Sequence, residues 1–357
     1  MIYSKVEVQN FRCFEKITVD GLKQVNLITG QNNVGKTAFL ETMFIMAGTS
    51  GELMLRTDTF RGMPGISINL SGAGATESPL NSFFHNFNTD KEIILRAENE
   101  DNWNKVTIKS SAPSTILMST SDSEGRMALR GDQSRVLCEF VYENSKKDNF
   151  ANKLTLFPEK KQISFGDNVR PAFFEAIFLH NVSYNPKEDA DRLGRLLETK
   201  KDPEVVGALK ILEPRIKDIK IAPRGGDITI LIDIGKDRLI PLALSGLGMI
   251  KVLRLIVSML SVPGGVLLVD EIEVGLHWKA LLPIWQVIEK IAKQYDVQVI
   301  ATTHSLDCVR SAVEAFSGKQ KFDLGVFRFE ETKQGIQSIA YNEGSIKAAI
   351  ENDLEIR

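Results

Sequence analysis

The chain has 357 residues, of which 43% are hydrophobic and 25% charged, a composition typical of globular proteins. The formal net charge is −2, so overall charge argues neither for nor against nucleic-acid binding, and any DNA contact would require a local basic patch. The most apolar stretch, residues 249–262, contains Lys251 and Arg254 and is too short to cross a bilayer. We therefore expect no membrane contact and a large core arranged in two lobes.

The three cysteines are widely spaced and form no metal-ligand pattern; they are Cys13, Cys138 and Cys308. The first residues lack the features of a signal peptide. We therefore expect reduced thiols and a cytoplasmic location.

The N-terminal region carries the strongest local motif. Alternating residues predict strands at 2–8 and 14–19, and apolar residues predict a further strand at 24–29 and a helix at 36–47. Residues 30–37 read Gly-Gln-Asn-Asn-Val-Gly-Lys-Thr, which matches the phosphate-binding pattern G-x-x-x-x-G-K-[ST]. In such a strand, loop and helix, backbone N–H groups and the helix N-terminus face an anion.

The residue types in this loop indicate ATP and Mg²⁺ as cofactors. Lys36 is expected to reach the β- and γ-phosphates, and Thr37 to supply its hydroxyl to Mg²⁺. The expected nucleotide-binding residues of the loop are Gly30, Asn32, Asn33, Gly35, Lys36 and Thr37.

The middle of the chain predicts a β-rich lobe. Residues 48–90 are rich in Gly, Ser, Asn and Thr, and we expect mostly loop there. Short β-like runs separated by polar turns then favour an antiparallel sheet. These runs are 92–97, 103–109, 135–142, 154–157 and 162–165.

A small helical subdomain is expected next. Leucines and valines at helical spacing predict two helices within 187–215, too short for a coiled-coil arm. Strands are expected at 217–222, 227–234 and 238–242, with a hairpin turn at 224–227.

From residue 245 onward, apolar strands and helices alternate. Helices are expected at 247–260 and 277–292 and strands at 266–269 and 297–301, before a last helix and two strands. This alternation predicts a parallel sheet covered on both faces.

Polar motifs follow two strands of this predicted sheet. Asp270 and Glu271 come directly after residues 266–269, where ligands bind in open α/β sheets. Asp270 is expected to hold Mg²⁺, and Glu271 to polarise the attacking water. His304 follows the next strand and is expected to stabilise the γ-phosphate as a second catalytic residue, a structural histidine being the alternative.

The segment 244–248 opens the helix that precedes the acidic strand. Ser245 is expected to cap this helix, and Gly246 and Gly248 to leave backbone N–H groups free for an anion.

Together these motifs resemble those of ABC-type ATPases. Residues 30–37, 245–248, 266–271 and 303–304 are similar to the Walker A, signature, Walker B and H-loop motifs. The signature reads Ser-Gly-Leu-Gly in place of Ser-Gly-Gly-Gln, which departs from the pattern.

Two further stretches resemble the RecF/SMC/OLD branch, in particular stand-alone OLD-like ATPases. They are Asn10-Phe11-Arg12 and the run 270–277. Ile272 and Trp278 stand where such proteins often carry prolines, and Gln133 is the candidate for the Q-loop glutamine.

The resemblance implies an α/β fold with a mixed, mostly parallel core sheet, an antiparallel β lobe, a small helical insertion and no long coiled coil. Residues 1–48 and 216–357 would form the ATPase core, 49–186 the β-rich lobe and 187–215 the helical subdomain.

The resemblance also implies a dimer that sandwiches two ATP molecules. Each nucleotide would lie on the phosphate loop and acidic pair of one chain and meet Ser245 and Gly248 of the other, with residues 273–277 at the seam. ATP binding would close the dimer and hydrolysis would reopen it. Arg12 would approach the nucleotide, unless it is simply an exposed basic residue at a strand end.

The leading hypothesis is an ATP-hydrolysing clamp that controls an effector or acts on DNA, in phage defence. The stretch between Lys36 and Ser245 is too short for SMC-type arms, and the stretch after His304 leaves no room for a fused TOPRIM nuclease, so a nuclease effector would be a separate polypeptide. The alternatives are a RecF-like repair ATPase and a nucleotide-switched scaffold with little turnover.

DNA is a further candidate partner, because lysine pairs could contact phosphates. They lie at 146–147, 160–161 and 200–201, but short pairs of this kind are more often solvated surface.

Overall fold

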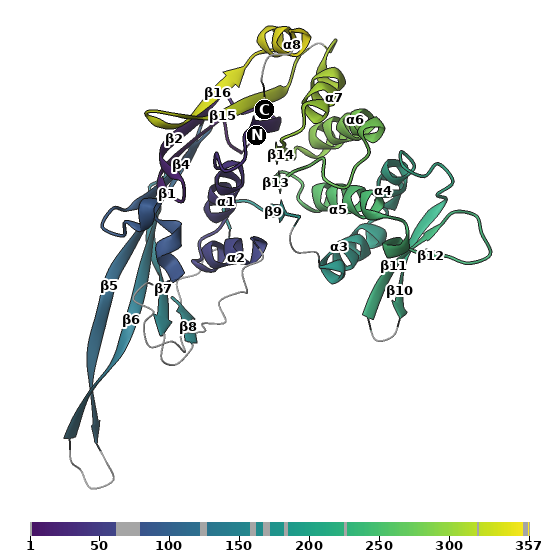
Figure 1. The fold of residues 1–357 in the computed structure, drawn as a ribbon. Coiled ribbons are helices and arrows are strands. Elements are labelled where there is room, and N and C mark those ends of the chain that lie inside the picture. Colours follow the sequence, from purple (N-terminus) through teal and green to yellow (C-terminus); the bar gives the residue numbers. More distant parts are fainter. Residues whose placement is uncertain are drawn as a thin grey trace.

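A computed structural model describes residues 2–61, 79–121, 127–157, 162–166, 172–181, 185–224, 227–319, 321–352 and 356, with side chains omitted for 112–136 and for a few residues beside the other gaps. A six-stranded sheet lies at the centre, between the antiparallel strands and α1 on one side and the helices of the C-terminal half on the other (Figure 1).

The central sheet is mostly parallel, as predicted. Its order is β16 (Gly335–Tyr341), β15 (Leu324–Thr332), β3 (Val25–Gly30), β14 (Gln298–Thr302), β13 (Val266–Val269) and β9 (Ala176–Leu179). Only β16 runs antiparallel to its neighbour. Strands β3, β13 and β14 are buried along their whole length, which explains their nearly continuous apolar sequences.

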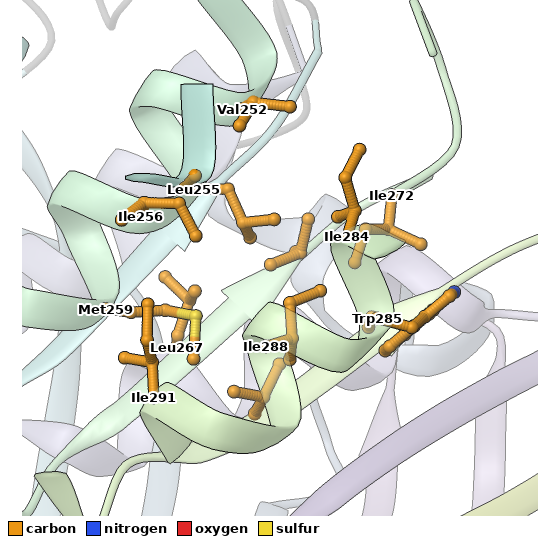
Figure 2. Close-up of a cluster of buried hydrophobic side chains, with 14 of the residues drawn as sticks. Val252, Leu255, Ile256, Met259, Leu267, Ile272, Ile284, Trp285, Ile288 and Ile291 are labelled. Atoms are coloured by element: carbon orange, nitrogen blue, oxygen red, sulfur yellow. The ribbon is translucent and has the colours of Figure 1, made fainter. Parts of the chain in front are cut away.

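Each face of this sheet packs on its own hydrophobic core. Leu267 and Val269 of β13 face α5 (Leu247–Ser261), α6 (Trp278–Tyr295) and α7 (Leu306–Phe316). Val266 and Leu268 face α1 (Lys36–Ala47) and the antiparallel sheet. Figure 2 shows side chains of α5 and α6 meeting over Leu267. The carboxyl end of β13 is therefore fixed from both sides.

The predicted antiparallel sheet is present, and it also contains the two N-terminal strands. Its order is β2 (Phe14–Asp20), β1 (Lys5–Phe11), β4 (Ile93–Glu98), β5 (Trp103–Ser121), β6 (Met127–Asn144), β7 (Asn149–Phe157) and β8 (Gln162–Phe165). Strands β5 and β6 are longer than the sequence pattern predicted and extend away from the lobe as a ribbon (Figure 1).

The prediction of loop across 48–90 was wrong in part. Residues Glu52–Phe60 form α2, and Pro79–Phe83 and His85–Phe87 form short 3₁₀ helices, η1 and η2. Met54 and Leu55 of α2 are buried, and the Phe60 ring packs against Phe44 of α1 at 5.2 Å between centroids. Tertiary packing thus forms a helix from a segment with weak local signals. Residues 62–78 lie outside the described part.

The predicted helical pair is confirmed as α3 (Pro186–Glu198) and α4 (Asp202–Leu209). The strands that follow are β10 (Asp218–Arg224), β11 (Asp227–Asp233) and the short β12 (Ile240–Pro241), which leads into η3 (Leu242–Leu244). The central residues of the predicted hairpin turn, 225–226, lie outside the described residues. The chain also forms α8 (Glu343–Glu351) after β16, which the sequence analysis did not anticipate.

Candidate functional site

The loop between β3 and α1 has the backbone shape that phosphate binding requires. Gly30, Asn33 and Gly35 have φ angles of 137°, 67° and 87°, in the region that favours glycine. A Cβ on Gly30 would lie 2.5 Å from the Phe329 carbonyl oxygen, and one on Gly35 would lie 2.5 Å from the Phe14 ring. Both glycines are therefore required by space as well as by backbone conformation.

Lys36 and Thr37 lie at the start of α1. The Lys36 ammonium donates to the carbonyl oxygens of Gly30 and Gln31 at 2.6 and 2.7 Å, so it lies across the loop. Burial lowers the pKa of Lys36, while the carboxylates of Asp270, Glu271 and Glu273 oppose that shift.

The hydroxyl of Thr37 and the carboxylate of Asp270 lie side by side. Thr37 Oγ1 donates to Asp270 Oδ2 at 2.9 Å, and Thr302 Oγ1 at the end of β14 donates to Asp270 Oδ1 at 2.6 Å. A hydroxyl and a carboxylate beside a phosphate loop are hard oxygen donors, so this donor set suits Mg²⁺. Thr302 orients the carboxylate and was missed by the sequence analysis.

Glu271 lies beside Asp270 on a left-handed backbone, with φ of 46°. Its N–H donates to Thr302 Oγ1 at 2.8 Å, and its Oε2 accepts a hydrogen bond from Asn181 Nδ2 at 3.1 Å. The side chain is 42% exposed. Glu271 is therefore oriented by a neighbour and accessible to water.

Asn181 and Lys251 form a second layer behind Glu271 that the sequence analysis missed. Asn181 follows β9, the neighbour of β13 in the sheet, and its Oδ1 accepts a hydrogen bond from Lys251 Nζ at 2.7 Å. Lys251 Nζ also donates to the Glu271 carbonyl oxygen at 3.3 Å. Burial lowers the pKa of Lys251 to about 8, with Arg254 as the next cause.

His304 faces carboxylates. Its Nδ1 lies 3.2 Å from Glu273 Oε1 and 3.9 Å from Glu271 Oε1, and its backbone N–H donates to Glu273 Oε1 at 3.1 Å. The ring is 52% exposed. Glu273 thus holds His304 beside Glu271. Glu271 follows β13 and His304 follows β14, so the two side chains lie at the same edge of the sheet.

The reading of Arg12 as an exposed residue was wrong. Its side chain is only 9% exposed, and it bonds to Glu41 Oε2 at 3.2 Å and to Asp58 Oδ1 at 2.8 Å. Its guanidinium lies 4.1 Å from the centre of the Phe83 ring. Arg12 ties the β1–β2 turn to α1 and α2, and it also lines the cavity described below.

The expectation that Ser245 caps α5 was also wrong. The cap position is Gly246, with φ of 90° and no side-chain hydrogen bond, while Ser245 ends η3. A Cβ on Gly248 would lie 2.9 Å from the Gly275 carbonyl oxygen, so the signature segment packs on the loop after Glu271.

A cavity of about 700 Å³ joins most of the predicted residues. Asn32, Asn33, Gly35, Lys36, Thr37, Asp270 and Glu271 line it, together with Arg12, Cys13, Ala38, Arg61, Ser82, Phe84, Asn86 and Phe87. Gly30, Ser245, Gly246, Gly248 and His304 are not among its lining residues. The signature segment therefore lies apart from the phosphate loop of its own chain.

The remaining candidates are Gln133 and three lysine pairs, and none of their described residues lines this cavity. The Gln133 side chain and the pair 160–161 lie outside the described residues. Lys146 and Lys147 lie at the β6–β7 turn, and Lys200 and Lys201 between α3 and α4, so these pairs stand on separate elements. Among the described residues, no helix has the length and apolar character needed to span a membrane.

The comparison with known families is decisive. A family model described as "AAA domain, putative AbiEii toxin, Type IV TA system" matches residues 25–307. The chain belongs to this family. The matched range contains the phosphate loop, the signature segment, the acidic pair and His304. A chain of this family with a P-loop and an acidic pair at one cavity is an ATPase.

Individual relatives are more distant. The chain is 22% identical over 325 residues, 85% of each protein, to a Helicobacter pylori protein named "ATP/GTP phosphatase". An Smc head bound to the C-winged helix domain of ScpA is similar at 11% identity and a TM-score of 0.48, over 98% of this chain and 100% of that one. The SMC head domain from Thermotoga maritima has 11% identity and a TM-score of 0.43, over 96% and 100%.

Proposed function

We propose that the protein is an ATP-gated homodimer in which each nucleotide is held between two copies of the chain. The observation that carries this proposal is the position of the signature segment. It does not line the nucleotide cavity of its own chain. Leu247 in this segment and Leu244 just before it are nevertheless 75% and 77% exposed to solvent. A second copy could bury them against its own phosphate loop.

Further exposed apolar side chains lie on the loop after Glu271 and at the start of α6. Val274 and Trp278 are also exposed, and a Cβ on Gly275 would lie only 3.6 Å from the Leu247 Cβ. We call Leu244, Leu247, Val274 and Trp278 the apolar face. Exposed clusters of large apolar side chains are typical of protein interfaces. The apolar face includes the loop after Glu271, so a partner bound there would contact both segments.

The chemistry within one chain follows from the described contacts. Lys36 would exchange its bonds to the loop carbonyl oxygens for the β- and γ-phosphates, and Thr37 and Asp270 would hold Mg²⁺. When bound, Mg²⁺ would neutralise charge on the phosphate oxygens. Glu271 would accept a proton from the attacking water, and His304, held by Glu273, would lie on the γ-phosphate side.

The second copy would complete the site through the N-terminus of α5. A Cβ on Gly246 would have no heavy atom within 4 Å, so space in front of this helix start is open within the described chain. Backbone N–H groups at a helix N-terminus bind anions. The partner's Ser245 and the partner's Gly248 would approach the γ-phosphate. Loss of the γ-phosphate on hydrolysis would remove this contact and release the dimer.

Mixing two inactive variants tests the shared site. Lys36→Ala removes the phosphate contact but keeps the signature segment, and Ser245→Arg blocks the signature segment but keeps the phosphate loop. If the site is shared, an equimolar mixture regains ATPase activity, because one intact composite site forms per heterodimer. If each chain hydrolyses ATP alone, the mixture stays as inactive as its components.

We further propose that the nucleotide state controls a separate effector, such as a nuclease, in cytoplasmic phage defence. The family description, which names a toxin and a toxin–antitoxin system, supports a two-component role. Phage plating efficiency on cells with the wild-type locus, Lys36→Ala or Glu271→Gln tests this. Protection lost in both variants supports the proposal, and equal protection in all three contradicts it.

A further inference from the structure

The nucleotide cavity extends beyond the residues that would hold phosphates. Lys36, Thr37 and Asp270 account for the triphosphate, but Phe84, Asn86 and Phe87 from the η1–η2 segment also line the cavity. Ala38 and Cys13 line it as well. Cys13 belongs to the β1–β2 turn, which is hydrogen-bonded to the η1–η2 segment. The described cavity thus contains a second region, built by the antiparallel lobe.

Phe87 is the unusual residue of this region. Its neighbours Phe83 and Phe84 are buried, whereas Phe87 is 62% exposed. Its φ is 58°, and that of Asn86 is 53°, in the left-handed region that a phenylalanine rarely adopts. The chain therefore holds a large ring in solvent, on a strained backbone, at the edge of the nucleotide cavity.

Hydrogen bonds fix this segment on the β1–β2 turn. The Arg12 N–H donates to the Phe83 carbonyl oxygen at 2.8 Å, and His85 Nδ1 lies 3.0 Å from the Arg12 carbonyl oxygen. A carbonyl oxygen can only accept, so Nδ1 carries the proton, and His85 Nε2 accepts from Asn86 Nδ2 at 3.2 Å. The Phe87 N–H donates to the Phe84 carbonyl oxygen at 3.0 Å.

The same turn contacts the phosphate loop. A Cβ on Gly35 would lie 2.6 Å from Cys13 Sγ and 2.5 Å from the Phe14 ring. Because Arg12 is anchored by Glu41 and Asp58, the turn and the Phe87 segment are held as one unit beside the loop. The backbone that carries Phe87 is therefore fixed beside the phosphate loop.

We propose that Phe87 is the stacking surface for the base of the bound nucleotide, with Asn86 beside it. This inference rests on nucleotide binding at the phosphate loop, which belongs to the proposed function. Lys36, Ala38, Cys13 and Phe87 line one continuous cavity, so a nucleoside attached to phosphates at Lys36 would share that cavity with the ring. An aromatic ring with a free face binds flat π systems without needing a particular hydrogen-bond pattern.

Calorimetric titration with two probes separates base binding from phosphate binding. ATP and inorganic tripolyphosphate, both with Mg²⁺, are titrated into the wild type, Phe87→Ala, Phe87→Trp and the control Phe165→Ala, an exposed phenylalanine on β8 that does not line the cavity. Phe87→Ala should weaken ATP binding about tenfold and leave tripolyphosphate binding unchanged. Phe87→Trp should bind ATP about as tightly as the wild type, and Phe165→Ala should not change the affinity for either probe.

Two results would overturn the inference. One is an unchanged ATP affinity in Phe87→Ala; the other is an equal loss for both probes, which would indicate a structural role. If the wild type binds neither probe, the proposed nucleotide site itself fails, and this inference fails with it. Because the wild-type titration is read first, the two failures are distinguishable.

Discussion

Lys251 Nζ lies 2.7 Å from Asn181 Oδ1, and Asn181 in turn donates to Glu271 Oε2 at 3.1 Å. An ammonium can only donate and a carboxylate can only accept, so the amide of Asn181 is oriented without ambiguity. Lys251 lies one turn after Gly248 on α5. A displacement of the signature helix would therefore be transmitted to Glu271, the carboxylate that we propose activates water.

Replacing Lys251 tests whether this contact positions Glu271. In Lys251→Met, kcat should fall roughly tenfold to hundredfold with little change in KM, because a misplaced base affects the chemical step more than binding. Lys251→Arg, which keeps a charged donor, should retain most of the activity. Steady-state phosphate release measures both. Equal losses of kcat in the two variants would indicate damaged packing instead.

The shifted pKa of Lys251 predicts a pH-dependent stability. The unfolded chain takes up the lysine proton near pH 10.5, but the folded chain only near pH 8. Between these values the unfolded state binds more protons, so the contribution of this residue to the free energy of unfolding rises with pH. Relative to Lys251→Met, the wild type should gain about 2 kcal/mol between pH 7.5 and 9.5. Urea denaturation of both proteins measures the difference, and a constant difference would contradict the shift.

The phosphate loop and the acidic pair could be predicted because their functional groups come from residues that are adjacent in the sequence. Gly30 to Thr37 and Asp270-Glu271 each combine their functional groups with a strand that positions them. Asn181 could not be found in this way. Its strand β9 pairs with β13, far away in the sequence, and its only local signal is four apolar residues followed by His180 and Asn181.

The errors have related causes. Lys251 was read only as a charge that interrupts an apolar helix, since the carbonyl and amide oxygens it meets belong to distant segments. Ser245 fits the residue preference of a helix cap, but it ends η3, and Gly246, with φ of 90°, takes the cap position of α5. For Arg12 the sequence left an exposed position open as an alternative, because Glu41, Asp58 and Phe83, which surround it, come from three separate elements.

Lys36→Ala should abolish ATP binding. The Lys36 ammonium is the cation of the phosphate loop, and its loss leaves the phosphates without a charged donor from that loop. We expect at least roughly a hundredfold loss of affinity by calorimetry. Lys16→Ala, an exposed lysine on β2, serves as the control and should bind ATP normally. Normal ATP binding by Lys36→Ala would show that Lys36 does not contribute to the nucleotide site.

A charge on the apolar face should prevent dimer formation without affecting ATP binding. In Leu247→Asp a carboxylate would be buried in the interface, and we expect a dimer weakened by roughly a hundredfold or more. The matched control is Ile339→Asp, because Ile339 is exposed on β16, away from this face. Sedimentation with ATP and Mg²⁺ measures the dimer, and calorimetry checks that each monomer still binds ATP. An Ile339→Asp variant that dissociates equally would mean that the interface lies elsewhere.

The mass of Glu271→Gln in solution tests the central claim most directly. This variant should bind ATP but lose at least roughly a hundredfold in hydrolysis, because the amide cannot accept a proton from water. Light scattering after gel filtration should then give a monomer without nucleotide and a stable dimer with ATP and Mg²⁺, with one ATP retained per chain. A Glu271→Gln protein that retains ATP and remains monomeric would contradict the shared site.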